Sequence, residues 1–317
     1  MDVQELLKRY AAGERNFPKA NLSGTNLSGI KLYDINLSQA NLREVNLSGA
    51  DLEWACLVQA DLYKANLSGT NLYRTNLSQA NLQGVNLNQA NLEWASVVQA
   101  DLSETDLLQA RELYGINLSK VNLHRANLSK IDLGGATLNE TCLSGANMRE
   151  AILGCVQSHR LDLRNADLTG ISATDANFSE ALLQGANLSR ALLLGANLSG
   201  ADITGANLNE ADLRESGFVR VSLKNANLHK ALLDYTTLFE ADLSGANLSE
   251  ASLRCANLKY VNMNGANLQG ADLRGADLTE SFLGKANLTN VNMRGANLLK
   301  VKLKQAIFFN TVMPDGF

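Results

Sequence analysis

From Leu22 to Met313 the chain repeats a five-residue unit, typified by Ala-Asn-Leu-Ser-Gly, with a large apolar centre and a small residue two positions earlier. The centres fall on every fifth residue from Leu22 to Leu107 and, after a shift of one, from Leu113 to Met313. A helix places apolar residues three or four positions apart and a strand places them two apart, so a period of five fits neither. The period instead predicts a solenoid whose short sides each bury one large and one small residue.

Sequence similarities at longer spacings indicate how many of these sides make one coil. Segment 51–62 nearly recurs as segment 91–102, a spacing of 40 residues. The position two residues after the centre repeats glutamine at a spacing of 20, in Gln39, Gln59, Gln79 and Gln99. A three-sided coil would give echoes at a spacing of about 15, so we infer four units in each coil. Residues 20 apart are then expected to lie directly over one another.

Asparagine or aspartate usually precedes the centre, and on one face asparagine recurs at the coil spacing. The column comprises Asn26, Asn46, Asn66, Asn86 and Asp106, and after the shift Asn127, Asn147, Asp167, Asn187, Asn207, Asn227, Asn247, Asn267 and Asn287. Stacked amides of this kind pair from one layer to the next in side-chain ladders. We therefore expect the loss of one such asparagine to destabilise the fold more than the loss of an exterior serine.

The phrase Ala-(Asp/Asn)-Leu-X-X, found for example at residues 40–42, 60–62 and 246–248, resembles the repeat of the bacterial pentapeptide-repeat proteins, which are especially abundant in cyanobacteria. The resemblance covers most of the chain. It implies an all-β solenoid, a right-handed quadrilateral β-helix of about 15 four-unit coils at roughly 4.8 Å per coil. Family members of understood function are mostly DNA mimics that protect topoisomerases.

Length and composition narrow the class of protein. A repeat array lengthens without thickening its core, so the 317 residues are expected to form one elongated domain. The net charge is −4 with acids and bases interspersed, which excludes both a basic nucleic-acid-binding tail and a strongly acidic block. No apolar run approaches membrane-spanning length and no signal segment is evident, so a cytoplasmic protein is expected. Cys155 and Cys255 are too far apart to pair, and four free thiols are expected.

The ends of such a stack expose apolar residues and unpaired strands, so they need caps. Residues 1–16 are expected to form a capping helix and linker, with the helix over residues 2–12. Asp2 and Glu5 form a capping box, and Gly13 can end the helix. Its apolar stripe comprises Val3, Leu6, Leu7 and Tyr10. A surface helix for a membrane or a calmodulin-like partner is the alternative, which the short length and mixed charge disfavour.

The repeats are expected to span residues 17–313, followed by a tail at 314–317. Four apolar side chains could cover the last coil or pair with a second molecule: Ile307, Phe308, Phe309 and Phe317. The family resemblance implies dimerisation through C-terminal ends, so an end-to-end homodimer through the C-terminal coil is one expectation. The chain has too few residues after the last repeat for a separate dimerisation helix.

One extra residue interrupts the repeat between Leu107 and Leu113. We interpret it as a one-residue bulge within 108–113, close to Arg111 and Glu112, because the asparagine column resumes when one residue is looped out. A hinge, or a division into two stacks, is the alternative.

Catalysis requires unlike groups that converge on one point, and the repeat distributes its polar residues singly. His124, His159 and His229 all follow centres but fall on different sides or coils. A filled solenoid also has no deep pocket. No catalytic residue, cofactor site or metal site is therefore predicted, and the protein is not expected to be an enzyme.

The most distinctive outer feature lies on one face of the N-terminal coils. One column contains Asp34, Trp54, Arg74 and Trp94, and the column beside it contains Tyr33, Glu53, Tyr73, Glu93 and, after the shift, Tyr114. The coil spacing is expected to place Arg74 between the two indoles, where cation–π contacts contribute about 0.5–1 kcal/mol each. Two interpretations stay open: a self-satisfied ladder that stiffens the coil, or a partner-binding surface formed by Tyr33, Trp54, Tyr73, Arg74, Trp94 and Tyr114.

A second column, further along the chain, stacks Arg254, Arg274 and Arg294 in consecutive coils. Like charges at this spacing repel by about 1 kcal/mol per pair in water, so they require nearby acids such as Asp272, splayed side chains or a bound anion. Neutralisation by acids is the favoured interpretation and an anion-binding stripe is the alternative.

These observations favour a non-enzymatic structural or protein–protein interaction solenoid with a protein partner. Direct binding to nucleic acid or to a membrane is not expected. The family resemblance implies an alternative, a DNA-mimic modulator of a type II topoisomerase such as DNA gyrase. Mimicry requires carboxylates spaced like phosphates, whereas Arg, Lys, Ser, Gly and Gln fill most outer columns here.

Overall fold

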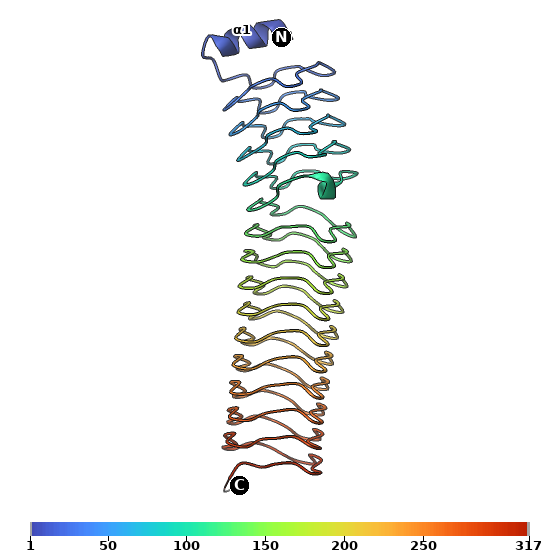
Figure 1. The fold of residues 1–317 in the computed structure, drawn as a ribbon, viewed down its shortest axis with the longest axis vertical. Coiled ribbons are helices and arrows are strands. Elements are labelled where there is room, and N and C mark those ends of the chain that lie inside the picture. Colours follow the sequence, from blue (N-terminus) through green and yellow to red (C-terminus); the bar gives the residue numbers. More distant parts are fainter. Residues whose placement is uncertain (1, 316–317) are drawn as a thin grey trace. The chain divides into compact units, whose positions relative to one another are not determined.

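The structure, a computed structural model, describes residues 2–315 and contains two helical elements, α1 (Val3–Ala11) and the 3₁₀ helix η1 (Leu107–Gln109). The rest of the chain forms coils joined by single parallel β-bridges between residues 20 apart, for example Asn21 with Asn41 (Figure 1). The coils belong to two compact units. Unit 1 comprises Met1–Leu123 and Ile131–Cys142, and unit 2 comprises His124–Lys130 and Leu143–Phe317. Each unit is a right-handed quadrilateral β-helix.

The predicted four-sided coil is confirmed by the residues that stack. The side-chain amide of Gln39 donates to Gln59 at 2.8 Å, Gln59 donates to Gln79 at 2.8 Å, and Gln79 donates to Gln99 at 3.0 Å. Residues 20 apart therefore lie in register, as a coil of four five-residue sides requires.

The five-residue unit satisfies all of its own backbone N–H groups, as the unit of residues 35–39 illustrates. Ile35 N donates to Leu32 O at 3.3 Å, which closes the preceding turn. The N–H groups of residues 36, 37 and 39 donate to carbonyls of the neighbouring coils at 2.7–2.8 Å. The remaining N–H, of Ser38, donates to the side-chain oxygen of Asn36 at 3.0 Å. Asparagine or aspartate before the centre supplies this acceptor, and an unpaired backbone donor would be costly.

Each side ends in a four-residue turn that begins at the apolar centre. The third residue of this turn has a positive φ, +58° for Gln39 and +55° for Glu44, which is the geometry of a type II turn. The two middle residues of the turn point outward, so they carry the surface chemistry of the protein. We call them the first and second turn residues.

The core contains two inward positions per side. The centres, such as Leu37, are fully buried, and the small residues that precede the next centre, such as Ala40, are almost fully buried. Where threonine takes the small position its hydroxyl can bond to a backbone carbonyl of the adjacent coil: Thr70 donates to Leu47 O at 2.8 Å. Burial of each central leucine contributes about 1.5–3 kcal/mol, offset by the entropy of ordering its side.

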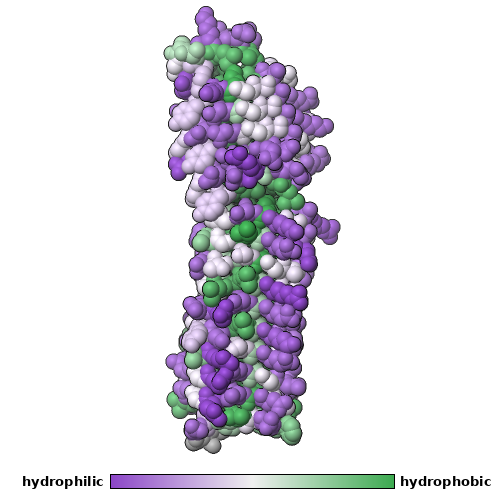
Figure 2. All heavy atoms as spheres, in the orientation of Figure 1, coloured by the Kyte–Doolittle hydropathy of each residue, from purple (hydrophilic) through white to green (hydrophobic). Residues whose placement is uncertain are grey.

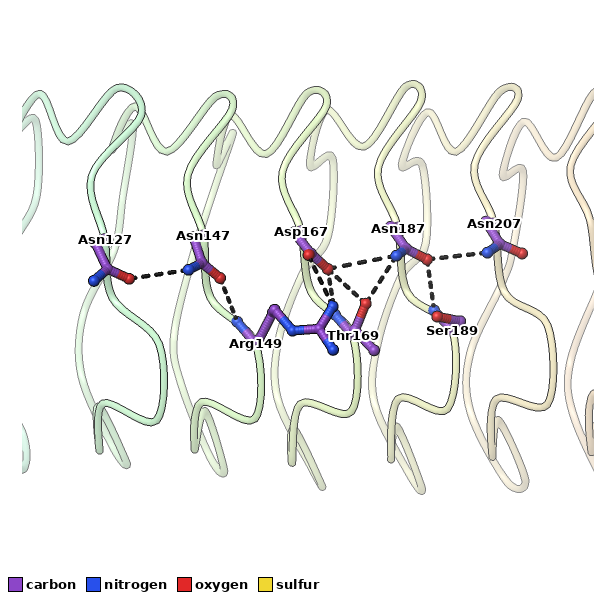
Figure 3. A network of polar contacts seen from close by, with 8 residues as sticks. All are labelled: Asn127, Asn147, Arg149, Asp167, Thr169, Asn187, Ser189 and Asn207. Carbon is purple, nitrogen blue, oxygen red and sulfur yellow. Dashed lines mark hydrogen bonds and ion pairs between the residues drawn. The ribbon is translucent and has the colours of Figure 1, made fainter.

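The asparagine ladder runs through unit 2 as predicted (Figure 3). Asn147 donates its side-chain amide to Asn127 at 3.0 Å, and Asn207 donates to Asn187 at 3.0 Å. Asp167 interrupts the ladder because a carboxylate cannot donate to Asn147, and Arg149 compensates by donating to Asp167 Oδ2 at 3.1 Å. Partial burial pushes the pKa of Asp167 up, but hydrogen bonds from Thr169 and Arg149 outweigh it and lower the pKa below its usual range.

The predicted capping helix is confirmed as α1. Asp2 is its N-cap and accepts a hydrogen bond from Glu5 N at 2.8 Å. Gly13, with a φ of +96°, ends the helix in a Schellman motif: its N–H donates to Tyr10 O, and Glu14 N donates to Arg9 O. Leu6 is buried, and the Tyr10 hydroxyl donates to Tyr33 O at 2.9 Å. These contacts hold α1 against the first coils of unit 1.

The extra residue produces a bulge in the β-bridges of unit 1. In a regular coil the residue before the centre uses both its N–H and its C=O to bond to the preceding coil. Opposite Asn91 these two bonds come from two different residues, Arg111 and Glu112. Arg111 N donates to Ala90 O at 2.9 Å, and Glu112 O accepts from Leu92 N at 2.8 Å. The side that leads into this bulge contains η1. The register therefore changes from 20 to 21 within unit 1, and the bulge lies apart from the boundary between the units.

The apolar residues near the C-terminus stay exposed in the single chain. Ile307, Phe308 and Phe309 are 57%, 45% and 70% exposed, so they do not bury themselves over the last coil. Phe317, which the sequence placed with them, lies outside the described residues. The homodimer through this end stays a prediction.

Candidate interaction surface

The residues singled out by the sequence lie together on one side of unit 1, which we call the aromatic surface: Tyr33, Trp54, Tyr73, Arg74, Trp94 and Tyr114. All six are first or second turn residues, so the turn geometry projects them outward. Tyr33, Trp54, Trp94 and Tyr114 are each between 44% and 48% exposed. A group of half-exposed aromatic rings is unusual on a surface and points to binding.

Arg74 and the indoles are arranged differently from the expected sandwich. The Arg74 guanidinium carbon lies 4.7 Å from the ring centre of Trp54 and 5.2 Å from that of Tyr73. Trp94 instead packs against Tyr114, with ring centres 5.5 Å apart and ring planes at 81°. Each indole therefore contacts a side chain of the coil that follows it: Trp54 contacts Arg74, and Trp94 contacts Tyr114.

Glycines make room for these two rings. A Cβ atom on Gly115 would lie 2.5 Å from the Trp94 ring, so the indole rests directly on the Gly115 backbone. A Cβ on Gly135 would lie 3.1 Å from the Tyr114 ring, and one on Gly134 would lie 3.2 Å from it. Sequence reasoning did not connect these glycines with the aromatic residues. The signal that it missed is an aromatic residue about 20 residues before a glycine, which indicates a ring packed on the glycine backbone of the next coil.

Carboxylates accompany the aromatic rings on this side. Asp34, Glu53 and Glu93 occupy the same turns as Tyr33, Trp54 and Trp94. Glu53 accepts a hydrogen bond from the Trp54 indole N–H at 3.0 Å. Within residues 2–315, none of these three carboxylates forms an ion pair (salt bridges in this region join other residues). The aromatic surface therefore carries acidic charge that the protein itself does not neutralise.

The second turn residues of unit 2 show the opposite arrangement. Acids and bases 20 residues apart pair from coil to coil, with Arg190 to Glu210 at 2.9 Å and Arg220 to Glu240 at 2.8 Å. The side-chain hydrogen bonds of these pairs lower the pKa of Glu210 and raise the pKa of Arg220. Sequence reasoning missed this alternation, although opposite charges at a spacing of 20 signal it. Figure 2 accordingly shows polar residues over much of the face in view, with short hydrophobic patches between them.

The arginine column of unit 2 is largely neutralised. Asp272 accepts from Arg254 Nε at 2.6 Å and from Arg274 Nη2 at 2.6 Å. Arg294 follows Asn292 rather than an aspartate, and it forms no ion pair with any described residue. Arg214, which sequence reasoning left out, belongs to the same column and pairs with Asp212 at 2.6 Å. The geometry matches the neutralisation that the sequence favoured for Arg254 and Arg274.

The histidines contact different neighbours: His124 contacts Ser144, His159 lies near Glu180, and His229 contacts Ser249. In the described part of the chain, no group of three or more His, Cys, Asp or Glu side chains is placed to hold a metal ion. The four cysteines, all within residues 2–315, form no disulfide. Neither helical element there has the length and apolar character needed to cross a bilayer.

Comparisons with known proteins agree with this architecture. The family described as "Pentapeptide repeats" matches eight segments, at residues 20–57, 55–93, 86–111, 116–154, 162–195, 196–234, 231–270 and 271–308. No curated protein gives a significant match.

Several solved structures are similar to the chain. HetL, a pentapeptide repeat protein involved in heterocyst differentiation regulation in the cyanobacterium Nostoc sp. strain PCC 7120, is 32% identical over 100% of this chain and 99% of its own, with a TM-score of 0.32. A protein of the Arabidopsis thaliana thylakoid lumen is 38% identical over 32% of this chain and 70% of its own, with a TM-score of 0.21.

QnrB1, a plasmid-mediated fluoroquinolone resistance protein, is 18% identical over 62% of this chain and 93% of its own, with a TM-score of 0.35. The repeat match covers most of the residues between 20 and 308. The chain therefore belongs to the pentapeptide-repeat family.

Proposed function

We propose that this protein is a non-enzymatic interaction scaffold that presents the aromatic surface of unit 1 to a protein partner. The observation that carries the proposal is the grouping of four half-exposed aromatic rings with one arginine on a single side. Tryptophan, tyrosine and arginine are the residues that most often anchor protein interfaces. They supply large contact areas, and each has a polar group that can bond to a partner.

The backbone beneath the rings supports this role. The turns that carry Trp54 and Trp94 are fixed by inter-coil hydrogen bonds, from Trp54 N to Tyr73 O at 3.0 Å and from Trp94 N to Tyr114 O at 2.9 Å. A surface that is already ordered loses little conformational entropy when a partner binds. A scaffold of this kind needs no deep pocket, because the partner docks along the turns.

Modulation of a topoisomerase by DNA mimicry is the second candidate, and the charges disfavour it. A mimic needs a line of carboxylates that is free to contact the basic groove of an enzyme. In unit 2 most of the acids at the second turn position are paired with bases one coil away, as in the Lys230–Glu250 pair at 3.6 Å. A gyrase supercoiling assay separates the candidates: we expect no inhibition at low micromolar protein, and clear inhibition would reverse the order.

The proposal is tested by affinity capture from native extract. The Trp54→Ala/Trp94→Ala variant is compared with wild type and with a Tyr235→Ala/Tyr260→Ala control, which removes two exposed aromatic turn residues from unit 2. We expect at least one captured protein to be lost with the tryptophan variant and retained with the control. Identical captured sets from all three proteins, each checked for folding, would contradict the proposal. The cytoplasmic location expected from the sequence stays a prediction.

A further inference from the structure

The aromatic surface contains the same dipeptide twice in equivalent turns, as Glu53-Trp54 and Glu93-Trp94. In the first copy, Glu53-Trp54, the indole is already in contact with an arginine of the protein, Arg74. Arg74 lies over the Trp54 ring at 4.7 Å, and the indole N–H of Trp54 donates to Glu53 at 3.0 Å. This copy shows that a guanidinium fits against the indole in this geometry.

The second copy is open. Gly115 occupies the position where the first copy has Arg74, so the next coil presents no cationic side chain to Trp94. Among the described residues, no arginine or lysine lies over the Trp94 ring. One region of the indole rests on Gly115, Tyr114 meets it edge to face, and 45% of Trp94 stays exposed.

The charge around the open copy is acidic. Glu93 makes no ion pair with any residue the structure describes, and the same holds for Glu53 and Asp34 in the coils above. Exposed indole and phenol faces attract cations, most strongly arginine. A carboxylate in the same turn adds a charge-assisted partner for the guanidinium.

We propose that the Trp94, Tyr114 and Glu93 side chains form a receptor for an arginine of a basic segment on the partner protein. The inference rests on the proposed interaction role and specifies the chemistry of the partner. The incoming arginine packs against the part of the Trp94 indole that Gly115 and Tyr114 leave exposed, and its guanidinium pairs with Glu93. The unpaired carboxylates Glu53 and Asp34 attract the flanking basic residues.

The two tryptophans are the only ones in the chain, so each can serve as the sole fluorescent reporter. Trp54→Phe leaves Trp94 as the reporter, and Trp94→Phe leaves Trp54. Each variant is titrated with a synthetic ten-residue peptide of alternating arginine and serine, and with a matched peptide of alternating glutamate and serine. We expect the arginine peptide to change Trp94 emission saturably, and the glutamate peptide to leave it unchanged.

Two further variants separate a specific site from general charge attraction. In the Trp54→Phe background, Glu93→Gln is expected to weaken binding of the arginine peptide by about threefold or more. Glu210→Gln removes one carboxylate from unit 2 and is expected to leave binding unchanged. Equal weakening by both substitutions, an equal response to both peptides, or an equal response of Trp54 and Trp94 would overturn the proposal.

The experiment also distinguishes this inference from the proposed function. If partner capture depends on Trp54 and Trp94 but the arginine peptide neither shifts Trp94 emission nor competes with the captured protein, the interaction role stands and the arginine receptor fails. If the arginine peptide competes with the captured protein and Glu93→Gln reduces capture, both are supported.

Discussion

At the scale of single residues, the asparagine before each centre has three hydrogen-bonding roles. Asn227 donates to Asn207 at 3.0 Å, accepts from Asn247 at 3.0 Å and accepts from the backbone N–H of His229 at 3.3 Å. The first two bonds link neighbouring coils, and the third fixes the turn that follows. Aspartate could accept the turn bond at the same position but would lose the amide donor to the neighbouring coil.

Replacement of Asn227 by alanine should therefore destabilise unit 2. The variant loses three hydrogen bonds and leaves the amide of Asn247 and the N–H of His229 without this partner, so we expect a loss of about 1–3 kcal/mol. Ser199→Ala, at a first turn position, is the control and should change stability by about 0.5 kcal/mol or less. Guanidinium chloride unfolding of the two variants measures the difference, and equal midpoints would contradict the ladder's energetic role.

Asp272 makes the stability of unit 2 depend on pH. Partial burial pushes its pKa up, but hydrogen bonds from Arg274 and Arg254 outweigh this and lower the pKa to about 2, from 3.8. A carboxyl whose pKa is lower in the folded state stabilises the fold above its unfolded pKa, and loses this contribution as the pH falls from about 4 to about 2. The arginines are half exposed, so solvent screening limits the contribution to the order of 1–2 kcal/mol.

Asp272→Asn tests this dependence. We expect the variant to be less stable than wild type at neutral pH, and the difference to shrink as the pH falls through the range between about 4 and 2. Glu215→Gln, which removes an exposed carboxylate from the same unit, serves as the control. The measurement is the unfolding midpoint of each protein across that pH range. A stability difference between Asp272→Asn and wild type that stays constant with pH would show that Asp272 does not cause the pH dependence.

At the scale of elements, the sequence predicts best what the repeat period controls. The period of five identified the buried positions, the coil of 20 residues and the stacked columns, because inward and outward positions alternate in a fixed order along every side. The N-cap Asp2 and the terminal Gly13 predicted α1 for a comparable reason, since caps are local. Arg74 and Trp94 were harder to place, because the direction of each side chain depends on its neighbours in adjacent coils: Trp54 for Arg74, and Tyr114 and Gly115 for Trp94.

The bulge itself leads to a prediction about deletions. Without Arg111 the chain would read Ala110-Glu112-Leu113, which is a regular repeat, so the deletion should restore a register of 20 across unit 1. We expect this variant to fold with a stability within about 1 kcal/mol of wild type. Deletion of Glu44, a second turn residue of the regular repeat centred on Leu42, leaves a four-residue side that cannot close. This deletion should lower the free energy of unfolding by about 3 kcal/mol or more. Thermal unfolding compares the two deletions, and an equal loss for both would show that the Arg111–Glu112 site has no special tolerance.

At the scale of the whole molecule, stability is built from neighbouring coils. The inter-coil backbone hydrogen bonds of the regular coils connect residues 19 or 21 apart, as in Leu37 N to Cys56 O and Cys56 N to Ile35 O. The energy of such an array is close to a sum of the stabilities of its coils and of the contacts between adjacent coils. A defect in one coil should therefore weaken the coils next to it more than distant ones. The sequence predicted this local character. It offered a division into two stacks only as an alternative and only at the extra residue, whereas the two compact units divide between residues 123 and 143.

Matched core substitutions, one in each unit, test this local character. Leu42 in unit 1 and Leu228 in unit 2 are both fully buried centres, so replacement of either by alanine should cost about 2–5 kcal/mol. In an array with only nearest-neighbour contacts, Leu42→Ala should raise amide hydrogen exchange in the coils around residues 22–62, and Leu228→Ala in those around 208–248. Mass spectrometry of exchanged peptides measures both variants against wild type. Each substitution should leave exchange in the other unit unchanged, and a rise spread evenly over both units would mean that the protein unfolds as a single cooperative body.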